Sequence, residues 1–275
     1  MSQYDLRDIS FLIHVRLDVD ERLENLTAVM DYYHEHCINV EFVIVNDDTE
    51  PDKRLKSLHE KYGDTSRFLF QQNKDIYHRT RAFNVGSTST DRPYIIAGDT
   101  DVIVHPKHIL KSVQILKSDD KIAAVFPYNG LFIELNDKLK QQLIETRDTS
   151  SLYEFIPPAD KHAPEYKDDN ITIIHDKSKG GCIVYSHKHW NTFNGYNPNF
   201  IGWGLEDDEI AHRIYVLGYY VVRVDDKEAV AWHLSHPNTM RKDNPHFDNN
   251  EKLCNFVGGI LDKPSMTAYI QSWKL

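Results

Sequence analysis

The sequence predicts an α/β protein with a mixed, mostly parallel central sheet that is flanked by helices. Two short apolar runs, residues 9–15 and 40–45, each end in a cluster of polar side chains. Between them, residues 21–36 carry apolar side chains at a helical spacing. A strand–helix–strand unit of this kind usually makes parallel sheet, whose ligands bind at the carboxyl ends of the strands. We therefore expect a ligand site built from the residues that follow the strands.

The same alternation continues along the first half of the chain and weakens beyond about residue 130. The further elements that the pattern predicts are helices at 51–62, 80–88 and 206–217 and strands at 67–70, 94–97, 181–186 and 220–224. A polar, proline-containing stretch at 156–170 is typical of a loop. We expect one catalytic domain over residues 1–275, with a nucleotide-sugar-binding half at about 1–105 and an acceptor-binding and catalytic half at about 106–275.

Composition narrows the classes of function. The formal net charge of −10 disfavours a broad grip on nucleic acid, because phosphates require Lys and Arg. Cys37, Cys182 and Cys254 are far apart and form no pairwise motif, which suits a reducing compartment. The N-terminal apolar run is too short for a signal sequence, and no segment resembles a membrane span. These observations predict a cytoplasmic protein.

Two aspartates follow the apolar run at 94–97 and form the pattern Asp99-Thr100-Asp101. Carboxylate oxygens are the ligands that hard divalent cations prefer, and such a cation bridges carboxylates to phosphate oxygens. An Asp-x-Asp (DxD) pattern is also common in solvated acidic turns. Its position directly after a buried strand favours the metal hypothesis.

A second pattern, Gly202-Trp203-Gly204-Leu205, precedes four consecutive acids at 206–209. The helix dipole alone explains acids at a helix start. It does not explain the preceding aromatic residue between glycines, which offers a flat apolar face to a sugar ring. A carboxylate next to such a face is placed to accept a proton from a hydroxyl.

Histidine and arginine complete the candidate site. His233 and His236 are spaced as a possible metal clamp, although most histidines are structural or lie on the surface. Arg16 follows the first strand and Arg79 lies beside the third predicted helix, and arginine binds phosphate with two donors. Each of them taken alone is equally compatible with a surface charge.

Together these residues resemble the GT-A fold glycosyltransferases, including family 2-type enzymes, and most closely the β-1,4-galactosyltransferase-like group. The resemblance extends over about residues 11–247. It rests on the Gly-Gly segment at 180–186, on Phe-Asn-Gly-Tyr at 193–196, on the Trp-Gly-x-Glu-Asp loop at 202–208 and on 77–86. It implies a GT-A fold and an inverting transferase that moves a hexosyl or pentosyl group from a UDP-sugar or another sugar nucleotide to a hydroxyl.

The resemblance also implies a role for each matching position. The nucleotide-binding positions are Arg16, Asp47, Tyr77, Arg79 and Asp99. The metal positions are Asp99, Asp101 and His236, and His233 replaces a methionine of the galactosyltransferases. The acceptor and donor-sugar pocket matches Gly180, Gly181, Trp203, Gly204 and Glu206, with Glu206 orienting the acceptor and Asp207 acting as the catalytic base. Because imidazole accommodates a wider set of ions than a thioether, we expect Asp101, His233 and His236 to hold Mn²⁺ or Mg²⁺.

Three alternatives remain open from the sequence. The acceptor is expected to be a glycan, but a hydroxylated DNA base is possible if Lys107, His108, Lys111 and Lys117 form a basic strip. A non-catalytic sugar- or nucleotide-binding module would keep the same fold. A metal-dependent phosphohydrolase would leave the Trp203 platform unexplained.

Overall fold

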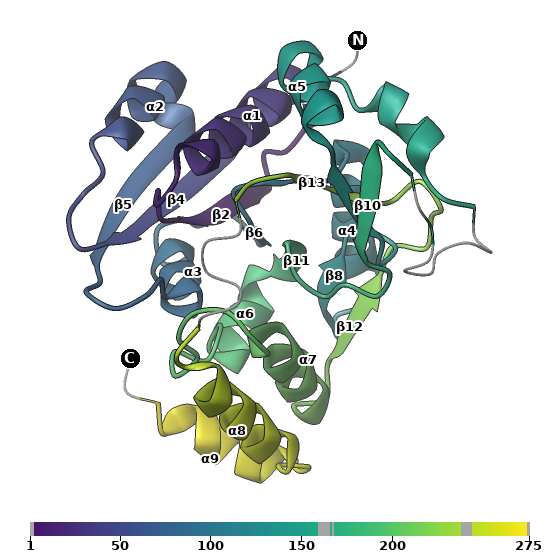
Figure 1. The fold of residues 1–275 in the computed structure, drawn as a ribbon. Coiled ribbons are helices and arrows are strands. Elements are labelled where there is room, and N and C mark those ends of the chain that lie inside the picture. The colour runs from purple at the N-terminus through teal and green to yellow at the C-terminus, as the bar shows by residue number, and fades with distance from the viewer. Residues whose placement is uncertain (1–2, 159–165, 167, 238–243, 274–275) are drawn as a thin grey trace.

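A seven-stranded sheet forms the centre of the computed structural model, which describes residues 3–158, 166, 168–237 and 244–273 (Figure 1). The strand order is β12-β8-β11-β6-β2-β4-β5. Four neighbouring strands, β6, β2, β4 and β5, are parallel to one another. The polar residues that follow these strands therefore gather at one edge, as the sequence pattern predicts.

The parallel strands and their connecting helices match the expected alternation. Their bounds are β2 (Ile9–Val15), α1 (Asp20–His36), β4 (Glu41–Asp48), α2 (Arg54–Tyr62), β5 (Ser66–Gln72), α3 (Arg79–Ser87) and β6 (Tyr94–Gly98). β2, β4 and β6 are almost completely buried because both faces of the sheet are covered. α3 packs against β2 and β4 and delivers its first residue, Arg79, to the edge where those strands end.

The other half of the sheet departs from parallel order. β11 (Cys182–Ser186) is antiparallel to both β6 and β8 (Ile122–Phe126), and β12 (Tyr220–Arg223) is parallel to β8. The sheet is thus mixed, as expected. Because β11 runs against β6, its start lies beside the end of β6, and Asp99 donates its backbone N–H to the carbonyl of Gly181 at 2.9 Å.

A second sheet of four strands was not predicted from the sequence. Its order is β10 (Ile171–His175), β9 (Phe132–Leu135), β13 (Ala231–Leu234) and β7 (Val102–Ile103). These strands have two to five residues each, which is too short for a periodic pattern to stand out. The sheet pairs β13 with β7, directly after Asp101.

The remaining helices enclose the sheets. They are α4 (Pro106–Ser118), α5 (Asp137–Thr146), α6 (His187–Phe193), α7 (Glu206–Val216), α8 (Phe247–Gly258) and α9 (Lys263–Gln271). The minor elements are β1 (Tyr4–Asp5), paired with β3 (Cys37–Ile38), and 3₁₀ turns at Gly63–Thr65 and Ser150–Phe155. α8 and α9, in yellow, form the C-terminal end beside α7 (Figure 1).

Two further observations concern the loop predicted at 156–170 and the apolar character of the helices. Much of the predicted loop at 156–170 lies outside the described residues. Within the described part of the chain, no helix combines the length and the apolar character that crossing a bilayer requires.

Candidate active site

A cleft of about 810 Å³ opens at the carboxyl ends of β2 and β6 and contains most of the predicted site residues. The predicted residues that line it are Arg16, Tyr77, Arg79, Asp99, Asp101, Gly180, Gly181, Trp203, Gly204, Glu206, Asp207, His233 and His236. They come from both halves of the chain. The cleft is therefore formed by residues that are far apart in sequence, and only Asp47 of the predicted set does not line it.

At one end of the cleft, Asp101, His233 and His236 form a group suited to a metal ion. One potential ligand atom from each residue lies within 4.8 Å of the other two. The Nε2 atom of His236 is 3.1 Å from Asp101 Oδ2, and Nε2 of His233 is 3.7 Å from Oδ1. A carboxylate and two imidazoles that converge through single atoms fit a divalent transition-metal cation.

The electrostatics of this group agree with a cation-binding role. Burial would raise the pKa of Asp101, but the hydrogen bond from His236 and the nearby His233 lower it to about 2. The same hydrogen bond raises the pKa of His236. Asp101 therefore stays ionised at every physiological pH and provides a permanent negative charge at the end of the cleft.

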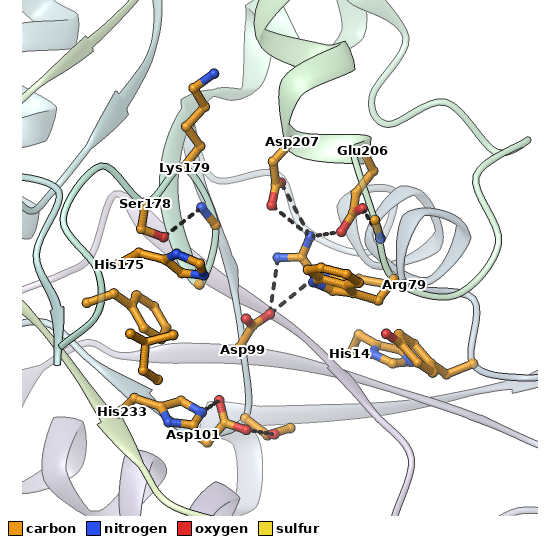
Figure 2. Close-up of a pocket in the computed structure, with 18 of the residues that line it drawn as sticks. His14, Arg79, Asp99, Asp101, His175, Ser178, Lys179, Glu206, Asp207 and His233 are labelled. Carbon is orange, nitrogen blue, oxygen red and sulfur yellow. Dashed lines mark hydrogen bonds and ion pairs between the residues drawn. The ribbon is translucent and has the colours of Figure 1, made fainter. Parts of the chain in front are cut away.

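In the middle of the cleft, Arg79 joins three carboxylates (Figure 2). Its guanidinium donates to Asp99 Oδ1 at 3.1 and 3.2 Å, to Glu206 Oε1 at 3.0 Å and to Asp207 Oδ1 at 3.3 Å. Burial opposes its charge, but Asp99 and Asp207 outweigh burial and hold its pKa well above the usual value. Asp99 thus faces Arg79 and lies outside the group formed by Asp101 and the two histidines.

Glu206 and Asp207 begin α7 and differ in their surroundings. Glu206 is buried, and both of its oxygens are used, Oε1 by Arg79 and Oε2 by the backbone N–H of Gly204 at 2.9 Å. Burial and the charge of Asp207 raise the pKa of Glu206 to about 7. Burial also raises the pKa of Asp207, although Arg79 and a hydrogen bond from Tyr196 partly oppose this effect.

The two neighbouring glycines at the start of β11 leave room for these groups. A Cβ atom on Gly180 would lie 2.8 Å from Asp207 Oδ2. Gly181 has a φ of +81°, and a Cβ atom there would lie 2.4 Å from a ring carbon of Phe132. Because Gly180 has no side chain, Asp207 Oδ2 can extend beside it toward the cleft.

The Gly-Trp-Gly loop, residues 202–204, forms another wall of the cleft. Trp203 is 38% exposed and stacks on Phe247, with ring centroids 6.0 Å apart. Gly202 and Gly204 both have positive φ, as required for the tight path of the loop. Asn244 holds the loop by donating to the carbonyl of Trp203 at 2.6 Å. Trp203 therefore presents an exposed aromatic face at the mouth of the cleft.

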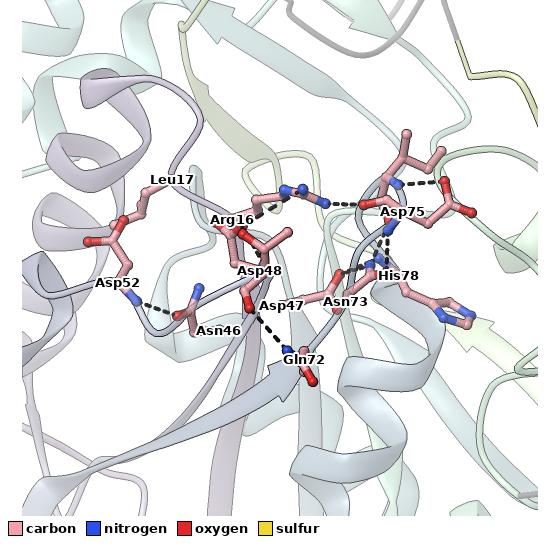
Figure 3. A network of polar contacts seen from close by, with 12 residues as sticks. Arg16, Leu17, Asn46, Asp47, Asp48, Asp52, Gln72, Asn73, Asp75 and His78 are labelled. Carbon is pink, nitrogen blue, oxygen red and sulfur yellow. Dashed lines mark hydrogen bonds and ion pairs between the residues drawn. The ribbon is translucent and has the colours of Figure 1, made fainter.

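Asp47, which the resemblance assigns to nucleotide binding, does not line the cleft. It is completely buried and accepts a hydrogen bond from Gln71 at 2.7 Å. It also accepts from Asn73 at 3.0 Å and from the backbone N–H of His78 (Figure 3). Burial is outweighed by its contact with His14, so its pKa falls to about 2. In this structure the carboxylate has no exposed surface, and its hydrogen bonds fix the segment that leads to Arg79.

Arg16 and Tyr77, which the resemblance assigns to nucleotide binding, both line the cleft. Arg16 donates to the carbonyl of Asp75 at 2.6 Å and approaches Asp48 at 3.8 Å. Tyr77 packs near the ring of His14, with centroids 5.5 Å apart. Burial raises the pKa of Tyr77, so its hydroxyl stays protonated and able to donate.

Several residues that line the cleft, or that contact its lining residues from the protein interior, were missed from the sequence. Glu134 on β9 lies 3.1 Å from Nδ1 of His233, and Tyr196 donates to Asp207 Oδ1 at 2.7 Å. Both contacts depend on tertiary structure. Glu134 stands in no motif, and Tyr196 ends the Phe-Asn-Gly-Tyr segment, whose pattern does not indicate a contact with Asp207. His14 and the rim residues 174–179 were likewise not predicted.

The basic strip that a DNA acceptor would need does not form. Lys107 pairs with Glu228 at 2.7 Å, Lys117 with Asp8 at 3.3 Å, and Lys111 approaches Asp226 at 3.9 Å. The fourth member, His108, is 1% exposed. These four side chains are therefore neutralised or hidden, and the DNA alternative has no support from them.

Comparison with known proteins also shows similarity to galactosyltransferases. Residues 170–237 match the family model described as the N-terminal domain of galactosyltransferase. The chain is 24% identical over 226 residues to the xylosylprotein 4-beta-galactosyltransferase of Caenorhabditis elegans, covering 74% of this chain and 60% of that protein. It is 21% identical over 211 residues to the chondroitin synthase of Escherichia coli, covering 71% of this chain and 30% of that protein.

Solved structures agree on the fold. The catalytic domain of Drosophila β1,4-galactosyltransferase 7, in complex with xylobiose, superposes with a TM-score of 0.54 at 16% identity, covering 95% of this chain and 83% of that chain. GalNAc-T7 with UDP, GalNAc and Mn²⁺ superposes with a TM-score of 0.59 at 14% identity, covering 90% of this chain and 47% of that chain.

Fold and sequence similarity together define the class of structure: this chain has the GT-A fold, and its relatives with known activity are glycosyltransferases. Within that class it is similar to the β-1,4-galactosyltransferases. The chain spans 30% and 60% of the length of the two curated relatives described above.

Proposed function

We propose that this chain catalyses the metal-dependent transfer of a sugar from a UDP-sugar to a hydroxyl group of a glycan, with inversion at the anomeric carbon. One observation carries the proposal: a single cleft joins the Asp101–His233–His236 group to the Arg79–Asp207 group. The first group suits the diphosphate of a donor, and the second places a carboxylate where a hydroxyl can be activated. The half at about 1–105 binds the nucleotide end of the donor, and the half at about 106–275 binds the acceptor, carries the base and adds His233 and His236 to the metal site.

The metal site has a defined set of residues in this proposal. Asp101, His233 and His236 hold a divalent cation, which neutralises the negative charge of the donor diphosphate when it is bound. Two imidazoles favour Mn²⁺ over Mg²⁺, because Mg²⁺ prefers oxygen ligands. GalNAc-T7, which shares the fold, contains Mn²⁺ with UDP in its solved structure.

The protein side chains supply the remaining chemistry. Arg79 lies between Asp99 and Asp207, so it can bind the departing diphosphate while it stays next to the base. Asp207 accepts the proton of the acceptor hydroxyl as the new oxygen–carbon bond forms and the bond to the diphosphate breaks. Attack from the face opposite the leaving group inverts the anomeric configuration. Trp203 offers its exposed face to a sugar ring.

The first experiment is a screen of sugar nucleotides with Mn²⁺, in which release of the nucleoside diphosphate is measured with and without glycan acceptors. We expect release from at least one UDP-sugar, increased by an acceptor hydroxyl and abolished by a chelator. The xylobiose complex of the Drosophila enzyme makes xylosides a reasonable first set of acceptors. Donor binding without release from any donor would instead indicate a binding module.

The second experiment tests the base. Asp207→Asn should lower transfer by at least 100-fold, because the amide cannot accept the proton, while donor binding stays close to wild type. Asp208→Asn is the matched control, since Asp208 is half exposed and pairs with Lys179 at 2.5 Å. Full transfer by Asp207→Asn would sink the assignment of the base.

A further inference from the structure

In the proposed metal site, His233 and His236 differ in the hydrogen-bond partner of Nδ1, the ring nitrogen that faces away from Asp101. In His236, Nδ1 lies 2.9 Å from the backbone carbonyl of Pro237. In His233, Nδ1 lies 3.1 Å from Oε2 of Glu134. Because a carbonyl and a carboxylate both accept hydrogen bonds, each Nδ1 is placed to donate its proton. Each Nε2, which faces Asp101, is then the nitrogen that can bind a cation once it gives up its own proton.

The contact between Glu134 and His233 follows from strand register. β9 and β13 are parallel neighbours, and Glu134 is the register partner of His233. Paired residues on adjacent strands project from the same face of a sheet, so the pairing of the two strands is enough to bring these two side chains into contact. The side chain of Glu134 is about one-third exposed and lines the cleft, yet it does not belong to the three-residue ligand group.

We propose that Glu134 is a positioning residue that sets the tautomer and orientation of His233 and thereby strengthens binding of a divalent cation at Asp101, His233 and His236. This inference rests on the proposed metal site. A carboxylate that accepts from the distal N–H of a metal-binding histidine fixes the ring and makes the other nitrogen a stronger donor. A hydrogen bond to a charged acceptor is also stronger than one to a neutral carbonyl.

Charge balance supports the same role. Asp101 is the only carboxylate in the ligand group, so the three ligands alone leave one positive charge of a divalent cation uncompensated. Glu134 adds a second negative charge on the far side of His233. Asp99 does not provide this charge in the structure, because its Oδ1 is paired with Arg79.

The test measures the affinity of the purified protein for Mn²⁺ alone, by isothermal titration calorimetry, with no sugar nucleotide present. Glu134→Leu should weaken binding by about 10- to 100-fold, the range found when such partners are removed. Glu134→Gln keeps an oxygen acceptor without the charge, so its loss should be smaller but measurable, at about three- to tenfold. Circular dichroism and thermal unfolding establish that each variant is folded.

A double-mutant cycle separates positioning from a general effect on structure. In a His233→Ala background, Glu134→Leu should weaken Mn²⁺ binding much less than in the wild type, because the hydrogen bond to His233 is already gone and only the charge of Glu134 is lost. A loss of equal size in both backgrounds would overturn the proposal. Should Glu134→Leu fail to fold, Glu134→Gln decides, and wild-type affinity in that variant overturns it.

The same measurements distinguish failure of the metal site from failure of this inference. If the wild-type protein does not bind Mn²⁺, the proposed metal site itself is wrong. If the wild-type protein binds and His236→Ala abolishes binding, the metal site stands. Wild-type affinity in both Glu134 variants would then show that Glu134 does not position His233.

Discussion

At the scale of single residues, Arg79 connects Asp99, which follows β6, to Glu206 and Asp207 at the start of α7. It is 6% exposed and contacts Asp99 through Nε and Nη2, and both Glu206 and Asp207 through Nη1. The planar guanidinium can hold several carboxylates in fixed directions, which the ammonium group of lysine cannot do. Its side chain also packs over the ring of Phe83, with 4.9 Å between the guanidinium carbon and the ring centroid.

Tyr196 allows a test of how the protein sets the pKa of Asp207, the proposed base. Its hydroxyl donates to Asp207 Oδ1 at 2.7 Å, and this bond lowers the pKa of Asp207 against the effect of burial. Tyr196→Phe removes the bond and keeps the ring, so the pKa of Asp207 should rise. Since the base must be ionised, the acidic limb of the kcat/KM profile should move to higher pH by about half to one unit.

The remaining charged neighbours of Asp207 stay in place in that variant, namely Arg79, Glu206 and the more distant Asp99. The rate well above the limb should therefore change little. Tyr62→Phe is the control, because Tyr62 makes the same type of bond to Asp31, also at 2.7 Å, away from the cleft. An unshifted limb in Tyr196→Phe would contradict the assignment of the limb to Asp207.

At the scale of elements, the second sheet determines where Asp101, His233 and His236 come together. β13 pairs with β7 on one side, and Leu234 donates its backbone N–H to the carbonyl of Asp101 at 2.8 Å. On its other side β13 pairs with β9, which carries Glu134. Helix α1 then fixes the end of β13, because the side chain of Asn25 donates to the carbonyl of Leu234 at 3.0 Å.

Asn25 provides a prediction at this scale. It is completely buried, so Asn25→Ala should lower the free energy of unfolding by about 1–3 kcal/mol, the cost of leaving buried polar groups without partners. It should also weaken Mn²⁺ binding, because the turn between His233 and His236 loses its anchor. Urea denaturation and calorimetry measure the two effects.

Thr27→Ala on the same helix is the matched control for Asn25→Ala. The hydroxyl of Thr27 bonds within α1, to the carbonyl of Leu23, so its removal does not affect β13. Lower stability with wild-type Mn²⁺ affinity in Asn25→Ala would show that α1 does not position the histidines.

The elements that the sequence predicted well are those with long or fully apolar patterns. The strand at 9–15 is confirmed with the predicted bounds, and the helix at 21–36 begins one residue earlier. β7, β9 and β13 were missed because two to four residues carry no readable period. The contact of Glu134 with His233 was missed for the same reason, since only strand register brings them together.

For the candidate site, the sequence indicated which residues gather but not how they pair. Asp99 and Asp101 are adjacent in the motif, yet one faces Arg79 and the other faces the histidines. Asp47 ends a strand as expected, but its burial follows from the partners Gln71 and Asn73 on a different segment. Side-chain direction and burial depend on packing, which spacing along the chain does not specify.

At the scale of the whole molecule, the cleft contains a buried carboxylate, that of Glu206, whose ionised form lowers the free energy of unfolding. Glu206 has a pKa of about 7 in the folded protein, above its ordinary value, because it is buried beside Asp207. The stabilisation linked to its protonated form is complete below the unfolded pKa of about 4.3 and is lost as pH rises toward 7. Above pH 7 the protein keeps an ionised, buried Glu206 at a cost in stability.

Glu206→Gln should therefore stabilise the protein at pH 8 by an amount on the order of 1–3 kcal/mol and should give no such gain near pH 4. The neutral amide resembles the protonated acid and still offers an oxygen to Arg79 or to the N–H of Gly204. Glu209→Gln on the same helix should have the opposite sign, because Glu209 pairs with the fully buried Arg213 at 2.9 Å. Urea denaturation of both variants at the two pH values measures these changes, and a Glu206→Gln protein no more stable than wild type at pH 8 would show that the ionised carboxylate is fully compensated by Arg79.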